Sequence, residues 1–393
     1  MDVLDFTRTL VAIDSQNPGV GEREIVAHLR EVCATFGLPA RVVEPVAGRP
    51  NLVVTVDRGP GRHLALSGHV DTKPVGDARD QWHTDPFELT VVDGDAYGLG
   101  SSDMKGAVAA MLLAMRRFAE DGPSGSLSLV LTADEEQGSA AGAQALAAGT
   151  SMPQIDAMVI CEPSGITEPW EAMHLVSRGI CCFEIDIRTA QGHSGLSPAL
   201  GRNAVLVAAD VLRAFESFQP TVSEPGRVPC DVTVNSGMLA EGGVAFGTWP
   251  GLCTVGVELR LVPGMDRDVV RAEIQSLAEE AAKGAAGVDV RYRPGSLGWM
   301  PAVELDPGHD VVAASQRAAR RVLGGALAVR GYPGGTDASY FMRDAGIPTV
   351  TSLGPGWLSV AHGPNERVGV GQLSQAVDLY EALTGEYLRS GVS

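Results

Sequence analysis

Apolar runs that read as strands alternate with stretches of small residues that read as helices, and this alternation limits the possible folds most strongly. The strand-like runs lie at residues 63–66, 127–131 and 157–160, and the helix-like stretches at residues 103–118 and 140–148. Parallel strands need long crossover connections, which helices of this length supply. The first third of the chain therefore predicts an α/β domain with a mainly parallel sheet.

A different pattern begins near residue 175 and ends near residue 295. A strand-like run, a helix, two strand-like runs, a second helix and a last strand-like run follow one another, and this order predicts an α+β sandwich of ferredoxin-like topology. The α/β pattern then resumes. We therefore expect one α/β domain made of residues 1–174 and 296–393, with residues 175–295 inserted into it as a second domain.

The charge and the cysteines limit the partners and the compartment. The 393-residue chain carries a formal net charge of −18, which argues against nucleic acid or an anionic membrane as a partner, because both attract basic surfaces. The six cysteines show no CxxC spacing, so reduced thiols are the simplest interpretation. Residues Met1 to Asp5 include acids where a signal peptide carries basic residues. We expect a cytoplasmic protein.

A histidine and an aspartate, His69 and Asp71, stand two positions apart just after the strand-like run at residues 63–66. On a strand, side chains two positions apart point to the same face. An imidazole and a carboxylate placed in this way can act as a metal ligand and as the partner that orients it. A histidine in an ordinary turn is the alternative, and the rest of the chain decides between the two.

Four further turns carry acidic or histidine side chains. Asp103 follows a Gly-rich turn, Glu135 and Glu136 follow the second strand-like run, Glu162 follows the third, and His362 lies near the C-terminus. Ligands of open α/β sheets bind at the carboxyl ends of the strands, so we expect these turns to converge. Each also has a structural alternative: a helix cap for Asp103, a solvated pair for the adjacent glutamates, a surface position for Glu162 and a hydrogen-bonded loop histidine for His362.

Taken together, five of these residues supply two imidazoles and three carboxylates: His69, Asp103, Glu136, Glu162 and His362. Two divalent ions about 3.5 to 4 Å apart need a bridging carboxylate, and each needs a nitrogen and an oxygen ligand. The donor set meets this requirement, and the lack of cysteine in it favours an open catalytic site over a closed structural one. Glu135, beside Glu136, would then accept the proton of the attacking water.

The sequence resembles a known family. It is similar to the dinuclear-zinc amidohydrolases and exopeptidases that include acetylornithine deacetylase, succinyl-diaminopimelate desuccinylase, aminoacylase and glutamate carboxypeptidase. The resemblance covers nearly the whole chain and is carried by SGHVDT, YGLGSSDMKG, ADEEQGSAAG, CEPS, QGHSGLSPALGRNA, VELRLVPG, GGTDAS and GPGWLSVAHGPNERV.

The resemblance implies two Zn²⁺ ions per chain, for which Co²⁺ or Mn²⁺ could substitute. His69 and Glu162 would hold one ion, and Glu136 and His362 would hold the other. Asp103 would bridge the two ions, with a cis peptide bond after it, as is common in the family. Asp71 would orient His69, and Glu135 would be the general base.

For the inserted domain, the resemblance implies a dimerisation or lid role in a homodimer. His193 would reach the partner's site and stabilise the oxyanion, and Arg260 would grip a substrate carboxylate. The turn Gly334-Gly335-Thr336-Asp337 would line the substrate end. The chain departs from the family at Gly247, which stands where an asparagine that contacts substrate is usual.

These features predict a metal-dependent hydrolase that cleaves the amide bond of an N-acyl amino acid or a similar small metabolite, with non-peptide C–N bonds preferred over peptide bonds. A deacetylase or deacylase is the favoured interpretation. A dipeptidase, a carboxypeptidase or a desuccinylase on the same scaffold is the alternative. A metal-free dimeric binding protein on the same fold is a more remote one, which intact ligands and an intact base argue against.

Overall fold

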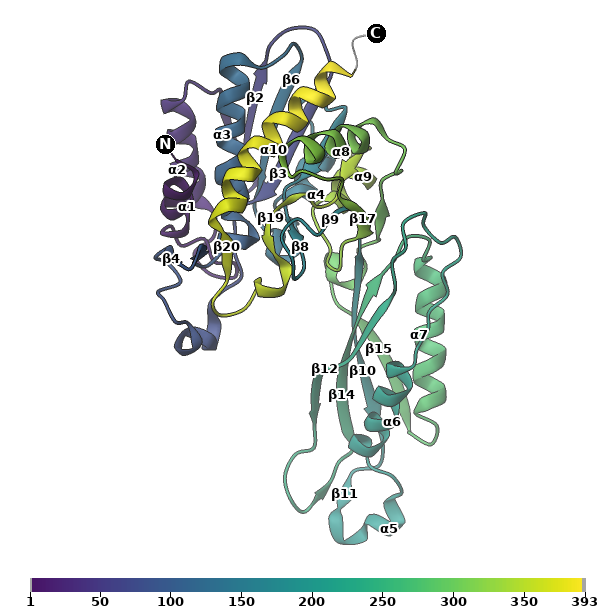
Figure 1. Ribbon diagram of the computed structural model, residues 1–393. Helices are drawn as coiled ribbons and strands as arrows, with labels where there is room; N and C mark the ends of the chain where they lie inside the picture. The colour runs from purple at the N-terminus through teal and green to yellow at the C-terminus, as the bar shows by residue number, and fades with distance from the viewer. Residues whose placement is uncertain (1, 391–393) are drawn as a thin grey trace. The chain divides into compact units, whose positions relative to one another are not determined.

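The computed structural model describes residues 2–390, so Met1 and residues 391–393, at the outer ends of the predicted α/β domain, lie outside the described residues. The chain forms two compact units. Unit 1 comprises Met1–Ser177, Glu304–Tyr332 and Thr336–Ser393, and unit 2 comprises Arg178–Val303 and Pro333–Gly335. Each unit has a sheet of its own (Figure 1).

A six-stranded sheet with the order β1-β2-β6-β3-β7-β18 forms the centre of unit 1. The neighbours β6, β3, β7 and β18 are parallel, whereas β1 and β2 run antiparallel at one edge. The predicted α/β class with a mainly parallel sheet is therefore confirmed. The strands are β1 (Ala40–Val46), β2 (Arg49–Asp57), β3 (His63–His69), β6 (Ser126–Thr132), β7 (Ala157–Ile160) and β18 (Thr349–Val350).

Helices cover this sheet. All of β7, and all but the first residue of β3 and of β6, are buried, as expected of parallel strands that are covered on both faces. Helices α3 and α10 contact each other and β3, and both cross the sheet in Figure 1. The helices of unit 1 are α1 (Val3–Val11), α2 (Arg23–Thr35), α3 (Gly106–Asp121), α4 (Ala143–Ala148), α8 (Asp310–Val322), α9 (Ala338–Arg343) and α10 (Val370–Arg389).

The helix expected to begin at Asp103 begins at Gly106 instead. The backbone of Asp103 (φ −124°, ψ 88°) and that of Met104 (φ −140°, ψ 36°) are not helical. The N–H of Asp103 donates to the side chain of Glu366 at 2.9 Å, a long-range contact that the local pattern does not reveal. The local sequence pattern therefore predicts this helix correctly but places its start too early in the chain.

Short strands complete unit 1 and join its segments. β20 pairs with β5, and β5 with β4, while β17 pairs with β9 and β19 with β8. They are β4 (Thr90–Val92), β5 (Asp95–Tyr97), β8 (Pro163–Gly165), β9 (Ala172–Ser177), β17 (Ala328–Gly331), β19 (Gly354–Trp357) and β20 (Arg367–Gly369), and β16 (Val303–Glu304) falls at the boundary of the units.

Unit 2 has the topology expected of a ferredoxin-like sandwich. Its antiparallel sheet has the order β12-β14-β10-β15 and its elements follow one another as β-α-β-β-α-β. They are β10 (Gly179–Arg188), α6 (Ala204–Glu216), β12 (Thr233–Gly242), β14 (Leu252–Leu261), α7 (Arg267–Ala281) and β15 (Gly287–Tyr292), with the short elements β11 (Gly192–His193), α5 (Ser197–Leu200) and β13 (Thr248–Trp249).

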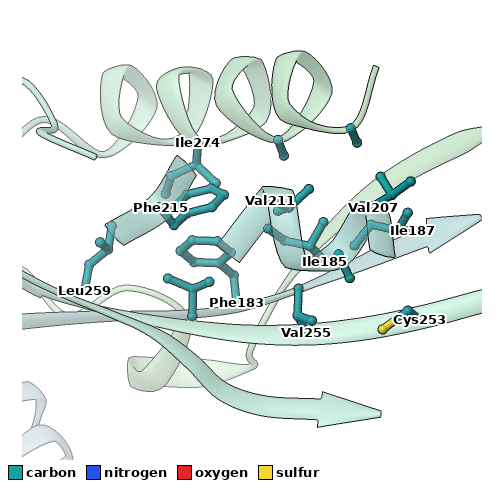
Figure 2. Close-up of a cluster of buried hydrophobic side chains, with 14 of the residues drawn as sticks. Phe183, Ile185, Ile187, Val207, Val211, Phe215, Cys253, Val255, Leu259 and Ile274 are labelled. Carbon is teal, nitrogen blue, oxygen red and sulfur yellow. The ribbon is translucent and has the colours of Figure 1, made fainter. Parts of the chain in front are cut away.

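The core of unit 2 lies between its sheet and its two long helices. Figure 2 shows Phe183 of β10, Phe215 of α6 and Ile274 of α7 pointing into this space. The rings of Phe183 and Phe215 lie 5.5 Å apart in a tilted arrangement that aromatic pairs favour. Cys181, Phe183, Ile185 and Ile187 are buried in this core, because every second side chain of β10 faces the helices. None of the described helices is long and apolar enough to cross a lipid bilayer.

Candidate metal centre

Three neighbouring parallel strands end at one edge of the unit 1 sheet, and a predicted site residue stands at or just after each end. His69 is the last residue of β3, Glu136 follows β6, and Glu162 follows β7. The strands are in register with Ser67 of β3 opposite Ile160 and His69 opposite Thr132. Their carboxyl ends therefore bring these side chains to the same edge.

Asp103 stands between two imidazoles. Its Oδ1 lies 2.9 Å from Nε2 of His69, and its Oδ2 lies 3.2 Å from Nε2 of His362. A second carboxylate lies beside each imidazole: Glu162 Oε1 is 3.3 Å from the His69 nitrogen, and Glu136 Oε2 is 3.1 Å from the His362 nitrogen. The structure therefore brings the five residues together as two imidazole–carboxylate pairs with one shared carboxylate.

This cluster is mostly shielded from water. His69, Asp103, Glu136 and Glu162 are buried, whereas the side chain of His362 is 47% exposed. Ligand atoms of His69, Asp103 and Glu136 all lie within 4.8 Å of one another, as do those of His69, Glu135 and Glu162. Glu135 thus lies within reach of the same centre.

Negative charge is concentrated around the two histidines. Burial disfavours the charged form of His362, but its hydrogen bonds with Asp103 and Glu136 outweigh this and raise its pKa to about 11. Burial, and then the nearby charge of Asp103, raises the pKa of Glu162 to about 8. Burial also raises the pKa of Glu135 well above its usual value. A cluster of this kind needs cationic charge, and nitrogen and oxygen donors suit zinc and other divalent ions.

The peptide bond between Asp103 and Met104 is cis, which confirms the expectation drawn from the family resemblance. The turn before it begins at Gly100 with a positive φ of 76°. A Cβ atom at Gly100 would lie 2.5 Å from Cγ2 of Thr72. Glycine is therefore required here both by the backbone conformation and by the close approach of Thr72.

Asp71 lies just beyond the end of β3 and holds several backbone groups. Its carbonyl oxygen is 2.9 Å from Nδ1 of His69, closer than its carboxylate at 3.6 Å. The carboxylate accepts the N–H groups of Glu135 and Glu136 at 3.2 Å each. Asn17 Nδ2 donates to it at 2.9 Å. Asp71 therefore ties His69 to the turn that carries the two adjacent glutamates.

Sequence reasoning missed two polar residues at this centre, Lys73 and Glu366, and gave a third, Asp337, only as part of a turn lining the substrate end. Lys73 Nζ lies 3.1 Å from Glu136 Oε2. The buried Asp337 accepts hydrogen bonds from the hydroxyls of Thr132 and Ser139, at 2.6 Å each, and burial raises its pKa to about 6. The buried Glu366 contacts the turn that carries Asp103. Asp337 and Glu366 stand in the motifs GGTDAS and GPNERV, so their motif membership was the signal available.

Of the predicted substrate residues, Thr336 and Asp337 lie in unit 1. Thr336 is buried, and its N–H donates to Ser177 Oγ at 2.9 Å. Gly334 and Gly335 belong to unit 2, where the Gly334 carbonyl accepts the N–H of Arg178 at 3.0 Å. A Cβ atom at Gly335 would lie 2.6 Å from Cε of Met300 and 3.0 Å from the carbonyl oxygen of Arg178, so a larger residue there would require the Met300 side chain to move.

His193, Gly247 and Arg260 also belong to unit 2. His193 is exposed, and its Nδ1 accepts the N–H of Gly195 at 3.0 Å. The loop of Gly247 lies beside it, because the Gly247 carbonyl accepts the N–H of Ser194 at 2.9 Å. Arg260 donates from Nε to Glu258 Oε1 at 2.9 Å. Within unit 2, His193 and the position of the missing asparagine are therefore neighbours.

Comparison with known protein families gives a match over most of the chain. The family described as peptidase family M20/M25/M40 matches residues 65–386. A succinyl-diaminopimelate desuccinylase from Xanthomonas campestris pv. campestris is 30% identical over 403 aligned residues, which cover 98% of this chain and 99% of that protein.

Solved structures with the same fold span both units. An M20 family metallo-carboxypeptidase from Sulfolobus solfataricus is 20% identical and superposes with a TM-score of 0.80, covering 99% of this chain and 100% of that one. A Bacillus subtilis protein described as a dinuclear metal-binding peptidase from the M20 family is 16% identical with a TM-score of 0.70, covering 98% of each chain. At these identities the likeness speaks for the fold.

Proposed function

Since the chain belongs to peptidase family M20/M25/M40 and is a metal-dependent hydrolase of amide bonds, we propose that it removes the acyl group from an N-acyl amino acid. The observation that carries this proposal is the position of Asp103, whose two carboxylate oxygens lie 2.9 and 3.2 Å from the imidazoles of His69 and His362. A carboxylate between two imidazoles is the arrangement that a bridged pair of divalent ions requires.

We assign the metal ligands by these contacts. His69 and Glu162 would hold one ion, Glu136 and His362 the other, and Asp103 both. We propose zinc, for which Co²⁺ or Mn²⁺ could substitute, because the donors are imidazole nitrogens and carboxylate oxygens without cysteine. When bound, the ions would polarise the amide carbonyl and lower the pKa of the attacking water.

Glu135 is the proposed catalytic residue for proton transfer. It accepts a proton as the water oxygen attacks the amide carbonyl carbon, and it gives this proton to the nitrogen as the C–N bond breaks, which releases a carboxylic acid and an amine. Its backbone N–H is held by Asp71 at 3.2 Å. Burial raises its pKa well above the usual value, and a raised pKa suits a group that must take up a proton and then donate it.

For the substrate, we propose an N-acyl amino acid with a free carboxylate. The desuccinylase relative acts, by its name, on an N-succinyl group. Arg260 of unit 2 is the proposed carboxylate ligand, since a guanidinium binds a carboxylate through two parallel hydrogen bonds. In the structure its Nε donates to Glu258, and the two terminal nitrogens of a guanidinium can still bind a carboxylate side by side.

We further propose a homodimer formed through unit 2. Strand β12 is an edge of the unit 2 sheet, and its residues Met238 and Leu239 are exposed. Val205 and Leu206 of α6 are exposed as well, and the side chain of Phe246 is fully exposed. An open edge strand flanked by apolar side chains is a surface that a second copy of the same strand can cover. His193 would then act in the site of the partner.

We propose a cytoplasmic location on the state of the cysteines. All six lie within the described residues and all are free thiols. Proteins kept in an oxidising compartment tend to carry disulfides, so unpaired cysteines favour a reducing one.

A substrate competition screen tests the proposed activity. N-acetyl amino acids, N-succinyl amino acids and dipeptides would compete for the enzyme after loading with Zn²⁺ or Co²⁺, and metal content would be measured on the same sample. We expect about two ions per chain and turnover of an N-acyl amino acid ahead of the dipeptides. A chain that binds no zinc, or that cleaves only dipeptides, would contradict the proposal.

A further inference from the structure

Glu366 is a buried carboxylate that no step of the proposed reaction uses. It is 2% exposed and stands four positions after His362, directly before β20. The antiparallel pairing of β20 with β5 places Arg367 opposite Tyr97, so the chain on either side of Glu366 is anchored beside the segment that leads to Asp103. The carbonyl of Glu366 accepts the N–H of Gly98 at 3.0 Å.

The side chain of Glu366 accepts three backbone N–H groups from one turn. Oε2 accepts from Gly100 at 2.8 Å, and Oε1 accepts from Ser102 at 3.0 Å and from Asp103 at 2.9 Å. Buried backbone N–H groups need partners, and this turn has non-helical residues whose amides cannot be satisfied by a helix. The carboxylate therefore supplies the hydrogen-bonding partner that the conformation of this turn requires.

One residue thus holds two parts of the candidate metal centre at once. Its side chain fixes the turn that ends in Asp103, whose carboxylate lies between the imidazoles. Its backbone continues the segment that carries His362, a residue held at a positive φ of 62°. The two segments carry ligands of the same proposed ion. They lie far apart in the chain, since Asp103 and Glu366 are separated by 263 positions.

We propose that Glu366 is a positioning residue that sets the metal affinity of the centre by holding the turn of Asp103 in register with the segment of His362. The inference rests on the proposed function, because it presupposes that Asp103 and His362 bind metal. Groups that orient metal ligands typically contribute 10-fold to 100-fold to metal affinity. The ion assigned to Asp103, His362 and Glu136 depends on both segments and should be affected most.

The substitution Glu366→Gln tests this with little change in shape. The amide keeps one acceptor oxygen for Ser102 and Asp103 but turns an N–H₂ group toward the N–H of Gly100, so one of the three hydrogen bonds is lost. Glu366→Asp keeps the charge and shortens the reach. The matched control is Glu171→Gln, because Glu171 also accepts backbone N–H groups in unit 1, from Ile166 and Thr167 at 3.2 and 3.3 Å.

Metal binding of the purified full-length chain would be measured by titration with Zn²⁺ against a chromophoric chelator, with Co²⁺ absorption spectra and thermal unfolding on the same samples. We expect at least 10-fold weaker binding of one ion and an altered Co²⁺ spectrum in both Glu366 variants, with wild-type values in Glu171→Gln. Wild-type metal affinity in folded Glu366→Gln, or an equal loss in Glu171→Gln, would overturn the inference. A wild-type chain that binds no metal would refute the proposed function itself.

Discussion

The candidate site residues of unit 1 and those of unit 2 differ in how firmly the fold holds them. In unit 1, the five residues of the candidate metal centre contact one another through the imidazoles of His69 and His362, and Asp71, Asp337 and Glu366 brace the segments that carry them. In unit 2, His193 is exposed, and Arg260 donates a hydrogen bond from its Nε to Glu258. The apolar core of unit 2 shown in Figure 2 supports its sheet and helices, not these side chains directly.

The two units therefore differ in whether their site residues are held in position before a ligand binds. Metal binding needs several ligands within a few tenths of an ångström of their positions, so buried hydrogen bonds must hold them before the ion arrives. Contacts with substrate or with a second chain can form later, so exposed side chains suffice. We therefore expect substitutions of the proposed metal ligands in unit 1, and of the groups that brace them, to change metal content. Substitutions of the candidate site residues in unit 2 should change only turnover or substrate binding.

The largest effect is expected from Asp103→Ala. Removal of the shared carboxylate takes one ligand from both proposed ions, so metal content should fall from about two ions per chain and hydrolysis should become undetectable. Atomic emission on dialysed protein measures this, beside His193→Ala and Arg260→Ala, which should retain both ions. If either unit 2 variant lost metal as Asp103→Ala does, the proposed division between the units would be wrong.

A large loss of turnover with intact metal binding is expected from Glu135→Gln. The amide cannot take up the proton of the attacking water, and loss of a general base typically lowers the rate by a factor of about 100 to 10,000. Steady-state kinetics on metal-loaded protein give this value. Near-normal turnover with two ions bound would exclude Glu135 as the base.

Mixed dimers test whether His193 acts in the partner's site. His193→Ala alone should lower kcat by about 100-fold to 1,000-fold, the usual cost of an oxyanion donor. Mixing this variant with the inactive Glu135→Ala chain should restore activity, because one site of the mixed dimer then has both groups intact. Absence of recovery, in samples where mass measurement confirms mixed dimers, would refute action across the dimer.

A smaller effect is expected from Arg260→Ala. Loss of a hydrogen bond to a charged group lowers the binding free energy by about 1.5 to 3 kcal/mol. KM for a substrate with a free carboxylate should therefore rise by roughly 10-fold to 100-fold. Arg293→Ala is the matched control, because Arg293 pairs with Glu184 at 2.9 Å in the same unit 2 sheet. An unchanged KM in Arg260→Ala would remove this residue from the substrate site.

The smallest effect concerns acid stability of unit 1. Burial lowers the pKa of His174, so the folded state holds it neutral while the unfolded state protonates it near pH 6.5. Its contribution to stability is therefore complete above that pH and is lost as the pH falls. Denaturant unfolding at pH 7.5 and 5.5 should show a smaller loss of stability in His174→Gln than in wild type. An equal loss in both proteins would contradict this role.

Local patterns in the sequence determined much of the fold and the composition of the site. Strand and helix periodicity indicated the parallel sheet and the ferredoxin-like order, because each depends on side chains a few positions apart. The rule that ligands gather at the carboxyl ends of parallel strands then placed His69, Glu136 and Glu162 at one edge. Their approach to one another in the structure follows from the neighbouring positions of β6, β3 and β7.

Only the tertiary structure decided how those ligands are held. The helix start at Gly106 instead of Asp103, and the roles of Lys73, Asp337 and Glu366, depend on contacts between segments far apart in the chain, such as the 263 positions between Asp103 and Glu366. Such contacts produce no periodic pattern in the sequence. A buried carboxylate that accepts hydrogen bonds from distant backbone N–H groups cannot be told, from the sequence, from any other charged residue in a loop.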